Sequence, residues 1–459
     1  MKGPLVLAGL VAAGSLASCV HVARSSTDGT PLVVETRTAF AGARSGSLGA
    51  VERDWIRGFC DARLDALVAE AIEHNAELEL AAARVARANA LARRAHAGLL
   101  PTLDVFAGAA RGDSGLGEAS RLDLGLAASW EVDLWDRLSH AERAAELDAE
   151  SARADWLGAR NALAAETARG WFLALASARR VEIDERSLAQ RERVERITRA
   201  RFDAGEAASA EVDVAIGTRA GALAQAEQSR GARRSALLSL ETLLGRYPAG
   251  ELELASELPP STADAPLGLP SELLERRPDV VAAERAIAAS FERVAAADAA
   301  RLPRITLSAQ GGYANDELSG LLDESNVIWN LASGIVAPLF DGGRLLADAE
   351  AARADRRAAL AGWVATARNA FLEVEAALND EAALRRREAA LAESVERLTR
   401  ARALAEDRYA EGEATLLELD QIHEQLYQSE RGRLDARLAL VLARVRLHLA
   451  LGGSFQTRS

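Results

Sequence analysis

Two carboxylates follow each of two glycine-containing segments in the chain. They are Glu211, Asp213, Glu418 and Asp420. Carboxylates that lie close together create a negative potential, which attracts cations and can be balanced by salt bridges. The solvated face of an ordinary helix carries such residues as well. The pattern therefore fits a charged functional cluster or a solvated helix face, and the elements that position these residues must decide between the two.

Cys19 is a candidate for covalent modification. Lys2 and an apolar stretch from Pro4 to about Ala13 precede it. This stretch is too short for a membrane-spanning helix, which takes about 20 residues, and is typical of a secretory signal. Leu16-Ala17-Ser18-Cys19 resembles the lipobox of bacterial lipoproteins, in which the cysteine becomes the lipid-bearing first residue. We therefore expect a covalent lipid on Cys19, and Val20 in place of Asp implies the outer membrane.

Catalytic and metal-binding patterns are missing from the sequence. Cys60 would have no disulfide partner, so we expect a small, buried apolar side chain there. No CxxC pair or HExxH string occurs and the 6 histidines are scattered, so no metal and no cofactor are predicted. Because there is also no nucleophile motif and no phosphate-binding loop, an enzyme is not predicted.

The composition is typical of long helices. Ala, Leu, Arg and Glu dominate, aromatic residues make up 4%, and only 11 prolines occur in 459 residues. No apolar run after the signal is long enough to predict a transmembrane helix. The net charge of -13 argues against a nucleic-acid partner.

The chain runs parallel to itself at an offset of roughly 200 residues, which indicates two copies of a large unit. Leu100-Pro101 corresponds to Leu302-Pro303, and Arg201–Ala207 corresponds to Arg408–Ala414. Each copy reads as helix, two strands, long helix, tight turn and helix.

Alternation of apolar with polar or small residues locates the strands. The first copy predicts a helix over 62–99, then strands over 102–110 and 121–132. The second copy predicts strands over 304–312 and 327–337. Each strand would have one apolar face.

Residues 139–203 and 344–410 contain no proline and predict two helices of about 100 Å. The shorter helices 72–99 and 209–245 together match one long helix. No globular core is that deep, so these helices should line an elongated object. The predicted division is a signal peptide at 1–18, a lipid-anchored extended segment at 19–61, a first repeat at 62–245, a connector at 246–270, a second repeat at 271–452 and a tail at 453–459.

Four short strands per chain are too few to close a membrane barrel, which needs at least about eight. An open strand edge is prohibitively costly in lipid. If the strands lie in a membrane, several copies must share one ring. A dimer would supply eight strands, a trimer twelve and a tetramer sixteen, and the pattern alone does not choose between them.

Four stretches, in order along the chain, resemble the TolC-like outer-membrane efflux proteins. They are Trp55–Leu67, Trp130–Arg137, Leu269–Val280 and Ala337–Arg344. The resemblance covers nearly the whole mature chain. The lipobox is similar to that of the lipoprotein (OprM/NodT-like) branch, which serves tripartite pumps with transporters of the resistance-nodulation-division (RND) type.

The resemblance implies a mainly α-helical homotrimer, in which a small twelve-stranded membrane β-barrel is continued by a long α-helical barrel across the periplasm. It also implies a passive outer-membrane duct that exports small molecules and docks on a periplasmic adaptor protein and an inner-membrane RND transporter. Two alternatives stay open. One is a duct for type I protein secretion, and the other is a lipid-anchored periplasmic coiled-coil scaffold without a channel.

The resemblance also assigns roles to the turns and to the carboxylates. Adaptor contacts would lie at the turn residues Arg201, Gly205, Arg408 and Gly412, although a plain glycine-capped turn explains them equally well. A ring of carboxylates would constrict the periplasmic aperture, with Glu211, Asp213, Glu418 and Asp420 as candidates. Glu418 matches one acidic gate position. Gln421 stands where relatives often have Asp, and Asp420 is about 100° of helix rotation away from it.

Trp130, Trp135 and Trp329 flank the predicted strands. They are candidates for an aromatic girdle at the membrane interface, with outer-membrane lipid as the partner. Packing at the junction between strand and helix is the alternative.

Overall fold

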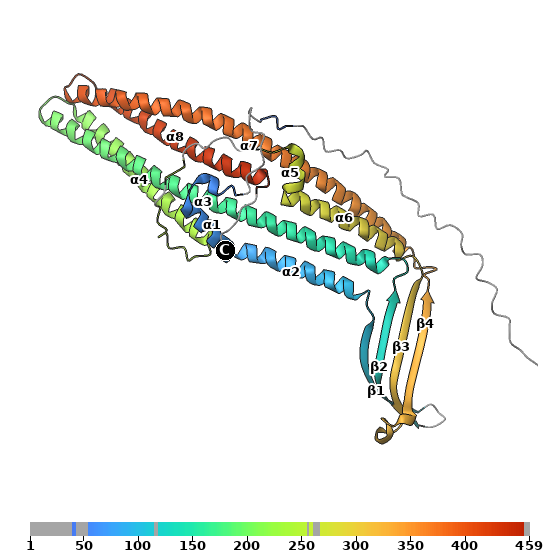
Figure 1. Ribbon diagram of the computed structural model, residues 1–459. Coiled ribbons are helices and arrows are strands. Elements are labelled where there is room, and N and C mark those ends of the chain that lie inside the picture. Colours follow the sequence, from blue (N-terminus) through green and yellow to red (C-terminus); the bar gives the residue numbers. More distant parts are fainter. Residues whose placement is uncertain (1–38, 43–53, 114–117, 255–256, 260–266, 454–459) are drawn as a thin grey trace, which may run out of the picture. The chain divides into compact units, whose positions relative to one another are not determined.

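The computed structural model describes residues 39–42, 54–113, 118–254, 257–259 and 267–453 (Figure 1). The chain divides into two units, of which the first, Met1–Val33, lies outside the described residues. The predicted signal peptide and the lipidation site Cys19 lie there too. The structure that follows is that of the second unit, Val34–Ser459.

Elements of the same kind follow each other in the two halves of the chain. The first half contains η1 (Arg57–Phe59), α1 (Ala62–His74), α2 (Ala76–Ala97), β1 (Thr102–Asp113), β2 (Glu118–Val132), α3 (Arg137–Asp203) and α4 (Ser209–Leu243). The second contains α5 (Pro270–Arg276), α6 (Pro278–Ala299), β3 (Arg304–Asn315), η2 (Leu318–Gly320), η3 (Glu324–Asn326), β4 (Val327–Val336), α7 (Arg344–Ala410) and α8 (Leu416–Ala450). Helices α3 and α7 have 67 residues each, and α4 and α8 have 35 each. A helix of that greater length extends for about 100 Å.

The continuous helix predicted over 62–99 is wrong, because the chain breaks at Asn75. The Asn75 side chain accepts hydrogen bonds from the backbone N–H groups of Glu77 at 2.9 Å and Leu78 at 3.2 Å, and so begins α2. Its Nδ2 donates to the carbonyl oxygen of Leu243 at 3.1 Å, at the end of α4. The break therefore ties the start of α2 to the end of a distant helix.

The four strands form one antiparallel sheet in the order β1-β2-β3-β4. The register aligns Val105 with Leu126, and Asp104 with Ala127. Because successive side chains point to opposite faces, one face of the sheet is mainly apolar, and the other carries mostly polar or small residues together with Phe106, Ile328 and Val336. The exposed apolar side chains on the first face are Leu103, Val105, Leu124, Leu126, Trp130, Leu307, Val327, Trp329, Leu331 and Ile335.

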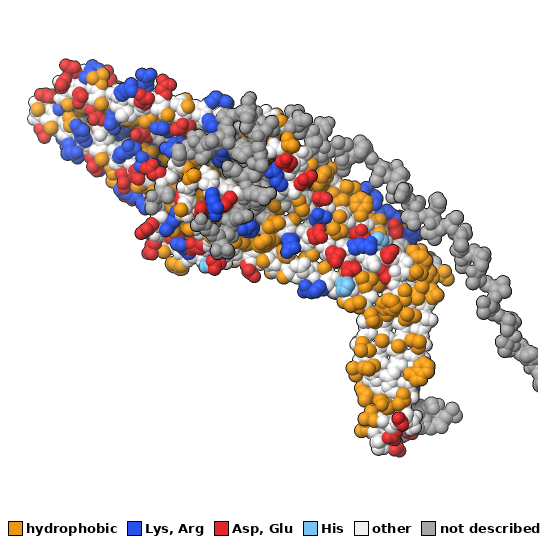
Figure 2. All heavy atoms as spheres, viewed as in Figure 1, with side chains coloured by type: hydrophobic (Ala, Val, Ile, Leu, Met, Phe, Trp, Pro, Cys, Tyr) orange, Lys and Arg blue, Asp and Glu red, His pale blue; other side chains and the backbone are white. Residues whose placement is uncertain are grey.

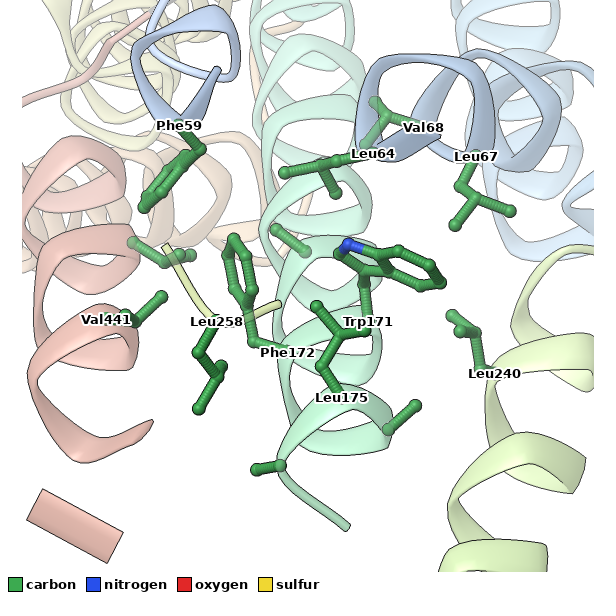
Figure 3. Packing of buried hydrophobic residues seen from close by; sticks show 14 of the residues in the cluster. Phe59, Leu64, Leu67, Val68, Trp171, Phe172, Leu175, Leu240, Leu258 and Val441 are labelled. Carbon is green, nitrogen blue, oxygen red and sulfur yellow. The ribbon is translucent and has the colours of Figure 1, made fainter. Parts of the chain in front are cut away.

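Helix α3 lies between other helices and carries the main core. It packs against α1, α2, α4, α6 and α8, and α7 packs against α6 and α8. Figure 3 shows Trp171, Phe172 and Leu175 of α3 pointing among side chains of α1, α4 and α8. The Trp171 indole N–H donates to the Asp61 carboxylate at 2.8 Å, which fixes the first turn of α1 on α3.

The expectation that Cys60 is a buried apolar side chain is wrong. Cys60 is exposed and has a left-handed backbone with φ 53°. It closes the short helix η1, in which Phe59 is the residue that enters the core.

Among the described residues, no helix combines the length and the hydrophobicity that a membrane span requires. On the face shown in Figure 2, arginine and acidic side chains intermingle over the ends of the paired helices α3/α4 and α7/α8. Hydrophobic side chains gather along the strands and at the adjoining helix ends.

Candidate functional site

The candidate site begins with two tight turns, one between α3 and α4 and one between α7 and α8. Gly205 has φ 81° and Gly412 has φ 79°, a left-handed conformation that glycine adopts without a steric penalty. The N–H of Glu206 donates to the carbonyl oxygen of Arg201 at 2.8 Å, and Glu413 donates to Arg408 at 2.8 Å. Both are bonds of the Schellman motif, which satisfies the last carbonyl groups of a helix.

The helices that follow the turns are capped by glutamates. Thr415 and Glu418 form a capping box, with the Thr415 N–H donating to the Glu418 carboxylate at 2.9 Å and the Glu418 N–H to the Thr415 hydroxyl at 3.3 Å. The backbone N–H and the hydroxyl of Thr415 hold the pKa of the Glu418 carboxyl below its usual range. In the other turn Glu211 accepts from the Ala208 N–H at 3.4 Å. Both glutamates therefore cap the first turn of the helix that follows each tight turn.

Tyr409 joins the two turns. It is 1% exposed and lies in an apolar cluster with Val194 of α3 and Leu419 of α8. Its hydroxyl is 2.9 Å from the hydroxyl of Thr198 in α3. The Arg201 guanidinium lies 4.9 Å from the centre of the Tyr409 ring and donates to the Tyr409 carbonyl oxygen at 3.4 Å. The end of α3 is thus tied to the end of α7.

The two candidate arginines differ in what they contact. Arg201 reaches across to α7, as described, whereas Arg408 donates to the carbonyl oxygen of Glu413 in its own turn at 3.2 Å. Both complement the negative end of a helix. Arg201 is in addition a tertiary contact, and Arg408 stays at the surface.

The five candidate residues of the aperture fall into three groups. Glu211 and Glu418 cap helices, as described. Asp420 pairs with Arg191 of α3, which also binds Glu424 at 2.9 Å. Asp213 and Gln421 are exposed, and neither forms a hydrogen bond or ion pair with any residue in the described ranges.

A second polar cluster lies along the same helices, and sequence reasoning missed it. Glu406 of α7 accepts from Gln190 Nε2 at 2.7 Å and lies 3.1 Å from His423 Nε2. Burial lowers the pKa of His423, and the Glu406 carboxylate offsets this only in part. The histidine is therefore neutral at pH 7. A lone histidine inside an arginine- and glutamate-rich pattern gives no signal that it will be buried.

The tryptophans mark the junction between the sheet and the helices. The indole N–H of Trp130 donates to the carbonyl oxygen of Leu99 at 2.8 Å, and that of Trp135 donates to Pro303 at 2.7 Å. The first bond ties β2 to the connection between α2 and β1. The second ties the connection between β2 and α3 to the one between α6 and β3. Trp329 is 81% exposed on the apolar face of the sheet.

A sequence model described as "Outer membrane efflux protein" matches the chain twice, over residues 67–246 and 269–453. The chain belongs to the outer membrane efflux protein family. The resemblance inferred from Trp130–Arg137 and Ala337–Arg344 is thereby confirmed, and the two matches each include one pair of strands and one pair of long helices.

Relatives of this efflux protein are outer-membrane proteins. The pyoverdine export outer membrane protein OpmQ of Pseudomonas aeruginosa is 32% identical over 421 residues, with 88% of each chain aligned. Outer membrane protein OprJ of the same organism is 32% identical over 417 residues, covering 88% of this chain and 86% of OprJ. The solved outer-membrane channel OprN superposes with a TM-score of 0.87 at 28% identity, covering 93% of this chain and 98% of OprN. The protein is thus an outer-membrane efflux protein with a mainly helical, TolC-like channel fold.

Within the described residues no three His, Cys, Asp or Glu side chains converge as a metal ion would require. The charged groups near the turns instead pair with each other, as Arg191 does with Asp420 and Glu424. These ion pairs hold α8 to α3.

Proposed function

We propose that this protein is the outer-membrane duct of a tripartite efflux pump, and that it works as a homotrimer without catalysing a reaction. Three copies of the sheet would form a twelve-stranded barrel, and the long helices would continue it as a tube through the periplasm. Small molecules, among them drugs and toxic compounds, would pass through it. The names of two relatives, the pyoverdine export protein OpmQ and the toluene efflux pump protein TtgI, support export of small molecules.

The observation that carries this proposal is a sheet with two chemically different faces and two open edges. Within the described residues β1 pairs only with β2, and β4 only with β3. Lipid demands that both edges be paired, and a ring of identical sheets pairs every edge. The apolar face with Val105 and Leu331 would then meet lipid, and the face with Asp104 and Asn330 would line the water-filled lumen.

The proposed partners follow from the ends of the molecule. A lipid on Cys19, a residue outside the described ranges, would anchor the chain in the outer membrane. The turns with Gly205 and Gly412 lie at the ends of α3 and α7 that are remote in sequence from the strands, so we propose that they contact the periplasmic adaptor, which links the duct to an RND transporter. Arg408 is the exposed cation available there, whereas Arg201 supports the turn from inside.

The candidate carboxylates would have different roles at the proposed aperture. Asp213 and Glu418 are exposed and would contribute negative charge to a threefold ring. Glu211 would stabilise the start of α4, and Asp420 would hold α8 to α3 through Arg191. Gln421 would leave its position neutral. The interface aromatics would be Trp329 on the lipid face, with Trp130 and Trp135 at the junction.

Adjacent residues of β4 offer a matched test. Leu331 lies on the apolar face and Asn330 on the polar face. A midplane arginine facing lipid costs about 2–4 kcal/mol, whereas one facing the lumen is tolerated. We expect Leu331→Arg to abolish trimers and ion conductance in planar bilayers, and Asn330→Arg to preserve both while changing ion selectivity. If the unsubstituted protein and both variants were all soluble monomers that could not be told apart, the proposal of an outer-membrane duct would be refuted.

A further inference from the structure

The sheet and the helices meet at a junction that joins the two halves of the chain. Trp135 follows β2, and its indole N–H donates to the carbonyl oxygen of Pro303 at 2.7 Å, in the connection between α6 and β3. Strands β2 and β3 pair beside this bond, with the end of β2 next to the start of β3. Leu302 and Pro303 are half-buried there. The approach of the β2–α3 connection to the α6–β3 connection is here called the junction contact.

Both partners of the junction contact have counterparts in the duplicated sequence. Leu-Phe-Asp at residues 339–341 follows β4, as Leu-Trp-Asp at residues 134–136 follows β2. Leu-Pro at residues 100–101 precedes β1, as Leu-Pro at residues 302–303 precedes β3. When two copies of a unit contact each other, the same contact surfaces recur at their free ends. One chain therefore carries the two surfaces for a second junction contact.

The counterparts are more exposed than the residues of the junction contact. Leu339 is 97% and Phe340 is 93% exposed, whereas Trp135 is 42% exposed. Leu100, at 53%, and Pro101 are exposed, whereas their equivalents in the second half are half-buried. Adjacent large apolar side chains that are almost fully exposed indicate a surface that binds a partner.

The counterparts lie at the two open edges of the sheet. Residues 339–341 follow β4 and residues 100–101 precede β1, and these are the outer strands (Figure 1). One copy cannot bring them together, because the edge strands are about 14 Å apart. When β4 of one copy pairs antiparallel with β1 of the next, the end of β4 lies next to the start of β1, as in the β2–β3 pair. The partner that fits is therefore a second copy of this chain.

We propose that residues 339–340 of each copy dock on residues 100–101 of the next copy, so that the junction contact between the halves recurs between the copies. The two contacts differ in one respect. Phe340 has no N–H group in its side chain, so the contact between copies is apolar where Trp135 forms a hydrogen bond. This inference rests on the proposed trimer and names the surface that closes it at the junction.

Crosslinking tests the contact in the purified full-length protein in detergent. Phe340→Cys and Leu100→Cys are combined in a Cys60→Ser background, because the Cys60 thiol is exposed. We expect a short bismaleimide to link neighbouring copies into covalent dimers and trimers on a denaturing gel. The Cys60→Ser protein without the new cysteines should give no linked product.

A matched control pair combines Phe340→Cys with Leu318→Cys in the same background. Leu318 is 76% exposed and lies in the connection between β3 and β4, at the other end of the sheet. The length of β4, about 33 Å, separates it from Phe340, so we expect roughly tenfold less linked product. Light scattering counts the copies independently. Trimers in which both pairs link equally little would overturn the contact and leave the duct standing, whereas monomers would overturn both.

Phe340→Ala distinguishes the second copy from lipid, the competing occupant of this surface. On mild heating in detergent we expect it to raise the ratio of dissociated copies to trimers roughly tenfold, because an apolar contact between copies is lost. Leu126→Ala is the control, since Leu126 is 49% exposed on the apolar face of the inner strand β2 and should leave this ratio unchanged. Equal dissociation of the two variants would assign residues 339–340 to the membrane and overturn the contact.

Discussion

Replacing Arg191 by glutamine is expected to loosen the first turns of α8 from α3. Arg191 is 8% exposed, and its guanidinium pairs with Asp420 and, at 2.9 Å, with Glu424. Glutamine keeps part of the packing of the side-chain stem and removes the charge. The carboxylates of Asp420 and Glu424, one turn apart on the same side of α8, would then lie next to each other without a cation.

The size of the effect follows from the exposure of the three groups. The carboxylate side chains of Asp420 and Glu424 are 32% and 48% exposed, so water can solvate them when the cation is lost. Removing one partner of a fully buried pair costs about 3–5 kcal/mol, and an exposed pair contributes about 0–1 kcal/mol. We expect about 2 kcal/mol, which raises the population of the opened contact roughly thirtyfold.

Amide hydrogen exchange read by mass spectrometry measures that population. Protection in residues 420–428 should fall roughly thirtyfold in Arg191→Gln, while protection near Ala450 at the far end of α8 stays the same. Arg199→Gln is the matched control, because Arg199 pairs with Glu195 of its own helix at 2.8 Å. Unchanged exchange in Arg191→Gln, or the same loss in Arg199→Gln, would show that the ion pairs do not hold α8.

Three further outcomes are expected. Tyr409→Phe removes the hydroxyl that contacts Thr198 and should cost about 1 kcal/mol, seen as a roughly fivefold loss of exchange protection in that part of α3. Burial lowers the pKa of His448 to about 3. As the pH falls, this histidine therefore binds a proton in the unfolded chain before it does so in the folded protein. The stability that His448 contributes should therefore decrease below about pH 6.5, by up to about 1.4 kcal/mol per pH unit. His448→Phe should remove this share of the pH dependence in unfolding experiments over about pH 4–7, and the share of His423 should remain. The exposed thiol of Cys60 should react with maleimide in the native protein, and a signal that appears only after denaturation would contradict its placement.

The long helices were predictable because their pattern is local and repeats over many turns. The predicted range 344–410 agrees with α7 as observed, and the predicted alternation in β1 to β4 recurs in the register of the sheet. The break at Asn75 was harder, since the apolar pattern of α1 runs on through it. The parallel between Ala76 and Pro278 was the available signal, because a proline begins α6 at the equivalent place.

Contacts between the halves could not be predicted from one sequence. Arg191 and Asp420 lie 229 residues apart, and nothing in either local pattern selects this pair among many arginines and acidic residues. The same holds for Glu375 and the backbone N–H groups of Ala41 and Gly42, 333 to 334 residues apart. Such pairs depend on which helices become neighbours, and that is decided by the packing of α3 against α8 and of α6 against α7.

The two parallel turns share their local backbone bonds but differ in their tertiary contacts. Local bonds are the same at Gly205 and Gly412, because both turns need a left-handed residue after a helix. The residue three positions before each glycine differs. Phe202 is 44% exposed, whereas Tyr409 is 1% exposed and brings a hydroxyl to Thr198. If the two turns were interchangeable, Phe202→Tyr would stabilise the turn at Gly205 as Tyr409 stabilises the turn at Gly412. Because Phe202 faces outward, we expect this substitution to give no gain in protection against amide hydrogen exchange at the turn with Gly205.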